Sequence, residues 1–208
     1  MSGPGEREKI LFVGAGGAVA SVLLPSLAKH YDIVGIAGSR KDLERQCIDF
    51  YSADLIKEPG LFSEIFSRHA FKSIVWNSVR YHPGPLLQSS RQTLHEEFDI
   101  AVALPVECLR SALEYGFGKD ATFILVTSGL AFFTKESWGS YSIVKHGQVI
   151  LAEYLAQELA AQGVSTKAIA LGTVTDIPAT TFEEVFLRAI RNADPVKILY
   201  KAYGERWE

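Results

Sequence analysis

Short apolar runs recur along the chain, and stretches with helical spacing lie between them. A continuous apolar run of roughly 4–8 residues is typical of a parallel strand that is buried on both faces. The runs predict strands at 10–13, 33–37, 73–77, 121–126, 166–171 and 196–200, with a shorter strand-like piece at 48–51.

Apolar residues spaced three and four apart predict helices between these strands. The helical stretches are 22–30, 41–47, 58–69, 92–115, 142–162 and 181–192. Pro105 lies inside the fourth stretch and is expected to kink it or to mark an irregular turn. Strands alternating with helices favour an α/β fold, a doubly wound parallel sheet of about seven strands between two layers of helices.

The length of 208 residues is most simply one domain, which we expect to span 9–208 after a flexible leader at 1–8. A hydrophobic share of 48% and a charged share of 22% are ordinary for a globular protein. The net charge of -3 gives no electrostatic case for binding nucleic acid or an anionic membrane. No apolar run approaches the roughly 20 residues that span a bilayer, and 1–9 does not resemble a signal peptide. We therefore expect a cytoplasmic protein.

The cysteines and histidines give no sign of a disulfide or a metal site. Cys47 and Cys108 have no C-x-x-C spacing, so both are expected to be reduced thiols. The five histidines include no H-x-x-x-H pair, and no ligand cluster stands out.

A glycine-rich turn follows the first predicted strand and leads into a helix. Strand, glycine turn and helix start form the phosphate-binding context of a dinucleotide fold, because a bare backbone can approach a pyrophosphate closely. The residues concerned are Gly14, Gly16, Gly17, Ala18 and Val19. A simple tight turn is the alternative, and the helix that follows favours phosphate binding.

The end of the second strand bears on the choice of nucleotide. No acidic residue stands at 38–41 to hold a ribose 2′-OH, whereas Ser39 and Arg40 offer a hydroxyl and a cation suited to a 2′-phosphate. The sequence therefore favours NADP(H) over NAD(H). The alternative is a solvated basic turn at a helix start.

Tyr141 and Lys145 are four residues apart, so they share one face of the long helix predicted after the fifth strand. A nearby ammonium favours the phenolate and lowers the pKa of a tyrosine, which suits an acid–base residue. Ser128, at the preceding strand end, could orient the oxygen of a carbonyl or alcohol. Taken singly, the three could instead be a packed aromatic, a solvated cation and a turn residue.

This combination resembles the short-chain dehydrogenase/reductase (SDR) family, over nearly the whole chain. The resemblance implies a Rossmann-like fold, a Ser-Tyr-Lys catalytic set, and nicotinamide ribose contacts from Tyr141 and Lys145. Ala53-Asp54-Leu55 looks like the family's adenine-contacting Asp-Leu, and Asn77-Ser78 stands within its Asn-Asn-Ala-Gly segment. Gly172 resembles the glycine of its Pro-Gly, after which backbone near Val174 would meet the nicotinamide amide.

The chain also departs from the family pattern. The last two glycines of the family's Gly-x-x-x-Gly-x-Gly motif fall at Ala18 and Ala20, and its proton-relay asparagine aligns with Ala101. The segment that usually forms a substrate lid is short here, so we expect an open site or one completed by a partner subunit.

The leading hypothesis is an NADP(H)-dependent oxidoreductase that acts on a small carbonyl, alcohol or imine, with no metal. Phe132, Trp138 and His82 are candidates for lining an apolar substrate pocket. One alternative is a regulator or scaffold that binds NADP(H) without turnover, and another is a redox-neutral epimerase or cyclase. By analogy with the family, and from the wide apolar surface of the helix at 142–162, we expect a homodimer or homotetramer.

Overall fold

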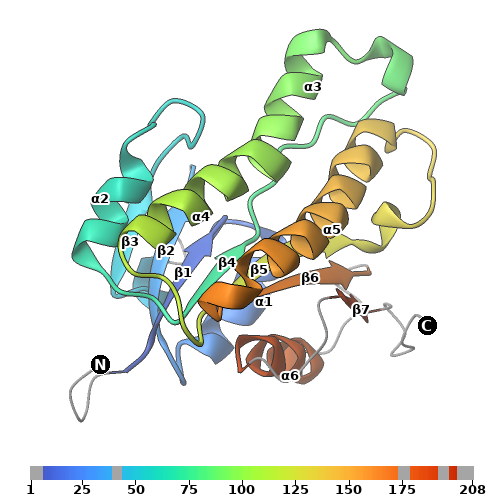
Figure 1. The fold of residues 1–208 in the computed structure, drawn as a ribbon. Helices are drawn as coiled ribbons and strands as arrows, with labels where there is room; N and C mark the ends of the chain where they lie inside the picture. The colour runs from blue at the N-terminus through green and yellow to red at the C-terminus, as the bar shows by residue number, and fades with distance from the viewer. Residues whose placement is uncertain (1–6, 39–43, 173–178, 192–196, 201–208) are drawn as a thin grey trace.

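A parallel sheet of seven strands forms the centre of the molecule, with helices on both faces (Figure 1). The computed structural model describes residues 7–38, 44–172, 179–191 and 197–200. The strand order is β3-β2-β1-β4-β5-β6-β7, and every neighbouring pair is parallel. The strands are β1 (Lys9–Val13), β2 (Asp32–Ala37), β3 (Asp49–Ser52), β4 (Ser73–Trp76), β5 (Thr122–Ser128), β6 (Ser165–Leu171) and β7 (Lys197–Tyr200). This arrangement confirms the predicted doubly wound sheet.

The helices divide between the two faces of the sheet. They are α1 (Ala18–Leu27), α2 (Leu61–Arg68), α3 (Arg91–Phe98), α4 (Leu104–Glu114), α5 (Gly139–Leu159) and α6 (Ala179–Ile190). Short 3-10 turns occur at Glu44–Gln46, Leu86–Gln88, Gly129–Ala131 and Ala160–Gln162. The helix predicted at 41–47 is represented, in its described part, by the first of these turns.

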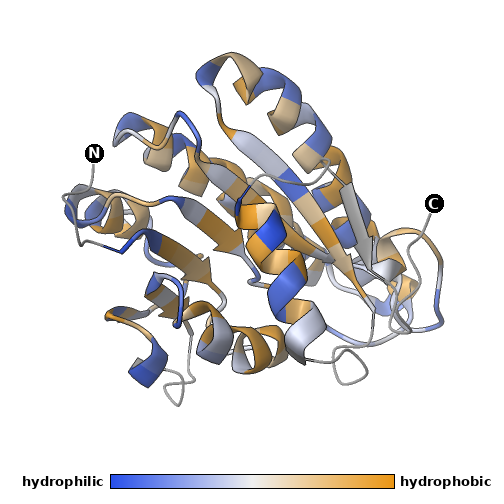
Figure 2. Cartoon of the chain, turned by 90° about the horizontal axis from the view of Figure 1, so that it is seen from below, coloured by the Kyte–Doolittle hydropathy of each residue, from blue (hydrophilic) through white to orange (hydrophobic). Residues whose placement is uncertain are grey.

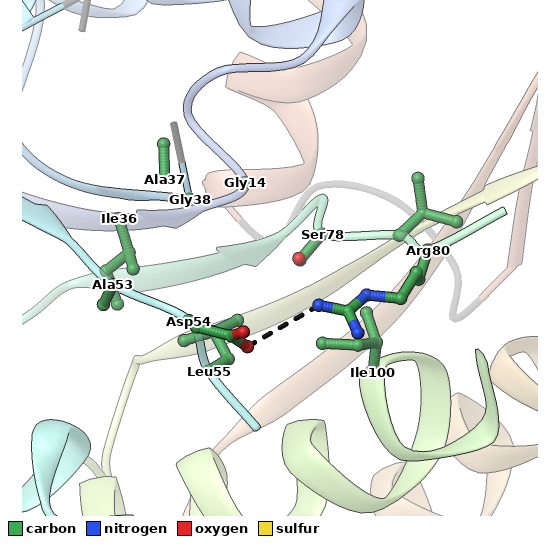
Figure 3. A pocket seen from close by; sticks show the side chains of 11 residues that line it. Gly14, Ile36, Ala37, Gly38, Ala53, Asp54, Leu55, Ser78, Arg80 and Ile100 are labelled. Atoms are coloured by element: carbon green, nitrogen blue, oxygen red, sulfur yellow. Dashed lines mark ion pairs between the residues drawn. The ribbon is translucent and has the colours of Figure 1, made fainter. Parts of the chain in front are cut away.

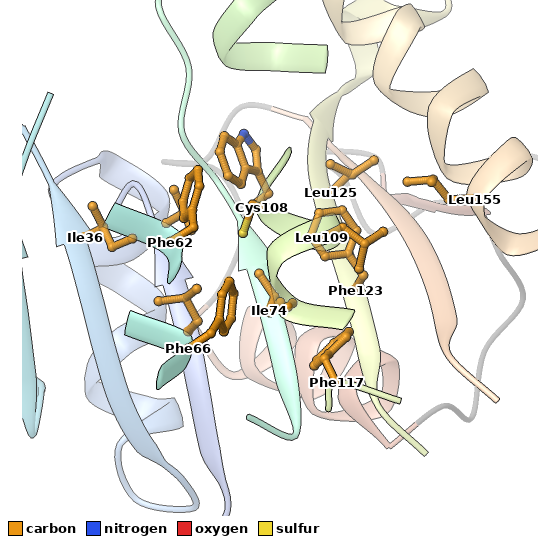
Figure 4. Packing of buried hydrophobic residues seen from close by; sticks show 14 of the residues in the cluster. Ile36, Phe62, Phe66, Ile74, Cys108, Leu109, Phe117, Phe123, Leu125 and Leu155 are labelled. Carbon is orange, nitrogen blue, oxygen red and sulfur yellow. The ribbon is translucent and has the colours of Figure 1, made fainter. Parts of the chain in front are cut away.

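Two hydrophobic clusters explain why the central strands are largely apolar. One packs α2, α4 and α5 against the sheet through residues such as Phe62, Leu109 and Leu155 (Figure 4). The other packs α1 and α6 against the opposite face through residues such as Leu23 and Phe186. Seen from below, most of the strand length is hydrophobic and the hydrophilic segments lie mainly on helices and loops (Figure 2). Because both faces are covered, side chains on both faces of each central strand are buried.

A π-helical turn, η3 (Asp99–Ala103), joins α3 to α4 next to Pro105. The Leu104 amide bonds the Asp99 carbonyl in the π register, so Ile100 would be next to receive a bond, from residue 105. Proline has no N–H to give, and the Trp76 indole donates to the Ile100 carbonyl instead, at 3.0 Å. The irregular turn predicted at Pro105 is thus confirmed.

The N-terminal end of the described chain is attached to the fold. Arg7 donates from Nη2 to the Ala28 carbonyl at 2.7 Å, and its Nε lies 3.8 Å from Asp32. The last residues of the expected leader therefore contact the domain, and 1–6 lie outside the described residues. Among the helices that the structure describes, none has the length and apolar character that crossing a membrane requires.

Candidate active site

Two adjoining cavities form a cleft at the carboxyl ends of β1, β2 and β4. The larger measures about 360 Å³ and is drawn in Figure 3; the smaller measures about 260 Å³. Both are lined by Gly14, Gly38 and Ser78. The chain runs outward from β1 to β3 and then returns to β4 on the other side of β1, so the cleft lies where the strand order reverses. Ligands of open α/β sheets bind at this position.

Gly14 brings the ends of β1 and β4 into direct contact. Its φ is +91°, and a Cβ placed there would lie 2.6 Å from the Ser78 amide nitrogen. Asn77 reinforces the contact, because its side-chain Nδ2 donates to the Gly14 carbonyl at 3.0 Å. Only glycine satisfies both the backbone angle and the close approach. In this structure Asn77 therefore shapes the glycine turn, while it also lines the smaller cavity.

The glycine turn opens directly into α1. Gly17 is the N-cap residue, and Gly16 and Gly17 both line the smaller cavity. Ala18 and Val19 occupy the first turn of the helix, where amides have no acceptor within the helix and are available to an anion. Ala20 is completely buried in the core between α1 and the sheet. Its methyl group, which replaces a family glycine, therefore packs into the interior.

Asp54 and Leu55 line the larger cavity, as the resemblance implies for adenine-contacting residues. Burial alone would raise the pKa of Asp54, but hydrogen bonds from Lys57 and from the Ile56 amide outweigh it, so the pKa is lowered. Lys57 Nζ lies 3.2 Å from Asp54 Oδ2. A carboxylate therefore stands at this wall of the cavity. Three other expected contacts, Ser39, Arg40 and Val174, lie outside the described residues, and Gly172 directly follows β6.

Ser128 and Tyr141 come together at the end of β5, the strand next to β4. Ser128 ends the strand, and its hydroxyl accepts from the Leu130 amide at 3.2 Å. Tyr141 lies in the first turn of α5, where burial raises the pKa of its phenol and a hydrogen bond with Ser128 lowers it; burial prevails. The sequence-predicted pair therefore lies together, at the same edge of the sheet as the cleft.

Lys145 lies one turn further along α5 and is only 3% exposed. Its Nζ donates to the Val126 carbonyl at 2.8 Å and to Gln148 Oε1 at 3.0 Å. Loss of solvent lowers the pKa of Lys145 to about 7. Nζ lies 5.5 Å from the centre of the Tyr141 ring, and the expected lowering of the Tyr141 pKa by Lys145 is not found. The amine bonds β5 and Gln148 and carries only part of its charge at neutral pH.

An aromatic cluster packs around Tyr141. The Tyr81 and Trp138 rings are stacked at 4.4 Å, and each meets Tyr141 edge-on, at 5.3 and 5.4 Å respectively. Trp138 thus packs beside Tyr141, and its predicted role in lining a substrate pocket stays a prediction. The His82 ring is instead paired with the buried carboxylate of Glu97 at 3.2 Å. Phe132, the third candidate for lining a substrate pocket, is 40% exposed, and that role stays a prediction. Tyr81 was not anticipated from the sequence.

Arg80 is a second residue that the sequence did not suggest, and it lines the larger cavity. Arg80 and Tyr81 follow Asn77 and Ser78 in the loop after β4, which has no periodicity to single out any side chain. Their position just beyond a strand end at the cleft is the signal that could have identified them. Among the described residues, no group of three His, Cys, Asp or Glu side chains is arranged to hold a metal ion.

Comparison with known families identifies the chain. A family model described as short chain dehydrogenase matches residues 65–184, more than half of the sequence. No curated protein sequence matches the chain.

Solved structures with the same fold include a short-chain dehydrogenase from Streptomyces avermitilis, with 15% identity and a TM-score of 0.79 over 95% of this chain and 89% of that one. A bulky-bulky ketone specific alcohol dehydrogenase from Comamonas testosteroni has 14% identity and a TM-score of 0.79, covering 92% of this chain and 85% of its own. A 3-oxoacyl (acyl-carrier-protein) reductase from Agrobacterium tumefaciens, with NADP bound, has 16% identity and a TM-score of 0.69, covering 80% of this chain and 70% of its own. At these identities the structures establish the shared fold alone.

The family match includes β4, β5, α5 and β6, and hence Ser128, Tyr141 and Lys145. The cleft at the strand-order reversal and the glycine turn complete the arrangement on the N-terminal side. The chain therefore belongs to the short-chain dehydrogenase family of nicotinamide-dependent oxidoreductases.

Proposed function

We propose that this chain is an NADP(H)-dependent oxidoreductase that interconverts a small carbonyl or imine compound and its reduced form. The observation that carries the proposal is the placement of Ser128 and Tyr141 together at the end of β5, next to the cleft, where burial raises the pKa of the Tyr141 phenol and the Ser128 hydroxyl partly offsets this. A phenol and a hydroxyl that lie together at one strand end form a site for a carbonyl oxygen, because both can donate to it.

The cleft suits a dinucleotide. The glycine turn is kept free of side chains at Gly14, and the first-turn amides of α1 are available to phosphate. Asp54 and Leu55 would hold the adenine, and Asn77 and Ser78 would lie along the ribose and phosphates. When bound, the nicotinamide supplies or accepts the hydride.

Tyr141 is the proposed acid–base residue. Its phenol donates a proton to the substrate oxygen as the carbonyl is reduced, and it takes that proton back in the reverse direction. Ser128 donates a hydrogen bond to the same oxygen and supports the negative charge that develops there. Lys145 would supply a cation near the phenol after leaving its bonds with Val126 and Gln148.

The preference for NADP(H) rests on Ser39 and Arg40, which supply a hydroxyl and a cation where NAD(H)-selective folds place an acid. The NADP-bound structure of the similar acyl-carrier-protein reductase agrees with this choice. We further propose a cytoplasmic location, which suits the absence of a disulfide at Cys47 and Cys108.

A second candidate function is nucleotide binding without turnover, as in a regulator or scaffold. The position of Lys145 favours this second function. Its amine donates to the Val126 carbonyl and to Gln148 Oε1, and it does not lower the pKa of Tyr141. A redox-neutral reaction on the same site would keep the nucleotide bound through purification and would consume none.

Calorimetric titration with NADPH and NADH, together with NADPH oxidation over a panel of ketones and aldehydes, tests the proposal. We expect NADPH to bind with micromolar affinity and more tightly than NADH. Tyr141→Phe should keep this affinity and lower turnover by roughly 10²–10⁴-fold, the usual size of acid–base catalysis.

The matched control is Tyr115→Phe, at a tyrosine that is 48% exposed at the end of α4, and this variant should turn over substrate normally. Binding without turnover of any carbonyl would favour the regulator, and equal turnover by Tyr141→Phe would refute the role of the phenol. An unchanged NADPH/NADH affinity ratio in Arg40→Ala would contradict the assignment of Arg40.

A further inference from the structure

Arg80 belongs to no recognised motif of the chain, yet its side chain reaches the larger cavity of the cleft (Figure 3). It stands in the loop after β4, three residues beyond Asn77. The guanidinium group extends across the cavity toward Asp54, which comes from the segment after β3. Side chains from opposite sides of the cleft therefore meet at one wall.

The guanidinium is held in place from its other side. Its Nη1 donates to Glu96 Oε2 on α3 at 2.7 Å, and Glu96 Oε1 accepts from Gln92 Nε2 at 2.9 Å. The short charge-assisted bond fixes the planar group at one end. The remaining donors of Arg80 are consequently presented to the cavity in a defined orientation.

Asp54 forms an ion pair with Arg80 but accepts no hydrogen bond from it (Figure 3). Arg80 Nη2 lies 3.6 Å from Asp54 Oδ1, which is longer than a hydrogen bond. The Asp54 carboxylate takes its own hydrogen bond from the Ile56 amide at 3.2 Å and is paired with Lys57. A hydrogen-bond donor and an acceptor thus stand side by side at the polar wall of a cavity whose other lining includes Ile36, Leu55 and Ile100.

This pattern is complementary to the edge of adenine. Adenine carries a donor, its amino group, next to ring nitrogens that accept hydrogen bonds, and its faces are apolar. The cavity of about 360 Å³ has room for a base with Arg80 in place. We propose that Arg80 is a specificity-determining residue of the nucleotide site, whose guanidinium donates to a ring nitrogen of the adenine while Asp54 accepts from the amino group. This inference rests on the proposed function insofar as that function requires a bound dinucleotide.

The test measures binding of NADPH and of ADP-ribose to the full chain. ADP-ribose carries the same adenine but has neither the nicotinamide nor the 2′-phosphate of NADPH. Arg80→Met should weaken both ligands by the same factor, about tenfold or more, the effect of one hydrogen bond from a charged group. Arg80→Lys should lose nearly as much, because an ammonium cannot reproduce the fixed Nη2 donor. The control is Arg91→Met, which removes an exposed arginine at the start of α3. This variant should bind both ligands as tightly as the wild type. Thermal melting followed by circular dichroism confirms that each variant is folded.

Each outcome decides between the two proposals. Full affinity in Arg80→Lys would show that Arg80 acts only as a charge near phosphate, and would overturn the assignment. Unchanged affinity for both ligands in Arg80→Met would overturn it as well, with the oxidoreductase proposal intact. Arg80-dependent binding of ADP-ribose without turnover of any carbonyl would refute the oxidoreductase and leave adenine recognition standing. If the wild-type chain bound neither ligand, both proposals would be wrong.

Discussion

Lys145 is a lysine in the interior, with its Nζ between the Val126 carbonyl and the Gln148 amide oxygen. The sequence places it four residues after Tyr141, and a lysine on a long helix is expected to keep its ammonium in water. The structure provides two polar partners instead, and the missing solvent lowers the pKa to about 7. At the scale of the residue, Lys145 is therefore poised between its charged and neutral forms near physiological pH.

This pKa makes the stability of the chain depend on pH in a defined direction. Between pH 7 and the ordinary value of 10.5, the unfolded chain binds a proton at Lys145 that the folded chain does not. The contribution of Lys145 to stability therefore rises as the pH increases through this window and is lowest below pH 7. Relative to Lys145→Met, the free energy of unfolding of the wild type should increase by about 2 kcal/mol from pH 7 to pH 9.

Urea unfolding of both proteins at the two pH values measures the difference, and changes in all other groups cancel in the comparison. Lys29→Met, which removes an exposed lysine, serves as the control and should show no such change. If the difference in the free energy of unfolding between the wild type and Lys145→Met stayed constant with pH, Lys145 would remain fully charged in the folded chain.

At the scale of the element, the irregular turn between α3 and α4 depends on a strand on the other side of the core. Pro105 leaves the Ile100 carbonyl without its helical donor, and the Trp76 indole of β4 supplies one at 3.0 Å. Trp76 is fully buried and packs beside Phe62. The π turn, the proline and the tryptophan thus form one unit that links the end of β4, and with it the loop carrying Arg80, to the helix layer.

Removing the Trp76 indole should destabilise the fold, because the Ile100 carbonyl then has no hydrogen-bond donor. Trp76→Phe keeps an aromatic ring but leaves the buried Ile100 carbonyl without a donor, so we expect a loss of about 2 kcal/mol in the free energy of unfolding. Pro105→Ala restores an N–H, and in the Trp76→Phe background it should recover part of this loss. Urea denaturation of the two single variants and the double variant gives the coupling energy. Strictly additive effects would mean that the proline and the indole act independently.

At the scale of the whole molecule, apolar side chains remain exposed on the outer helices. Ile143, Ile150 and Tyr154 share one face of α5 and are 58%, 39% and 60% exposed. Leu94 and Phe98, on the neighbouring α3, are exposed as well. We propose that these residues form the interface of a homodimer or homotetramer, since contiguous apolar surface of this kind marks association sites.

A charge placed in this face should separate the subunits. Tyr154→Lys would bury an ammonium in the proposed interface, and we expect the particle mass to fall to that of a single chain at micromolar concentration. Light scattering measures the mass directly. Leu87→Lys, at a side chain that is 99% exposed on a different segment, should leave the assembly unchanged. A wild-type chain that is already monomeric would refute the proposed interface.

The fold was predictable because its strands are buried on both faces and therefore read as continuous apolar runs, as at β1 and β5. The placement of Ser128 at a strand end and of Tyr141 at a helix start was predictable from the apolar run before them and the helical spacing after them. Arg80 and Tyr81 were not, since their positions depend on Glu96, Trp138 and other contacts between distant segments. The burial of Lys145 was likewise not predictable from its own helix, because its amine is held by a hydrogen bond to the Val126 carbonyl of β5.

The contact of Gly14 with Ser78 has a consequence for the assembly of the molecule. The two residues belong to segments that are far apart in the sequence, and the pairing of β1 with β4 brings them together. A chain that has formed only its first three strands possesses the glycine turn but not the opposite wall of the cleft. The complete cleft therefore exists only where β4 has paired with β1, and a nucleotide bound there would add stability only to chains in which this pairing has formed. Nucleotide binding would then report that β1 and β4 are paired.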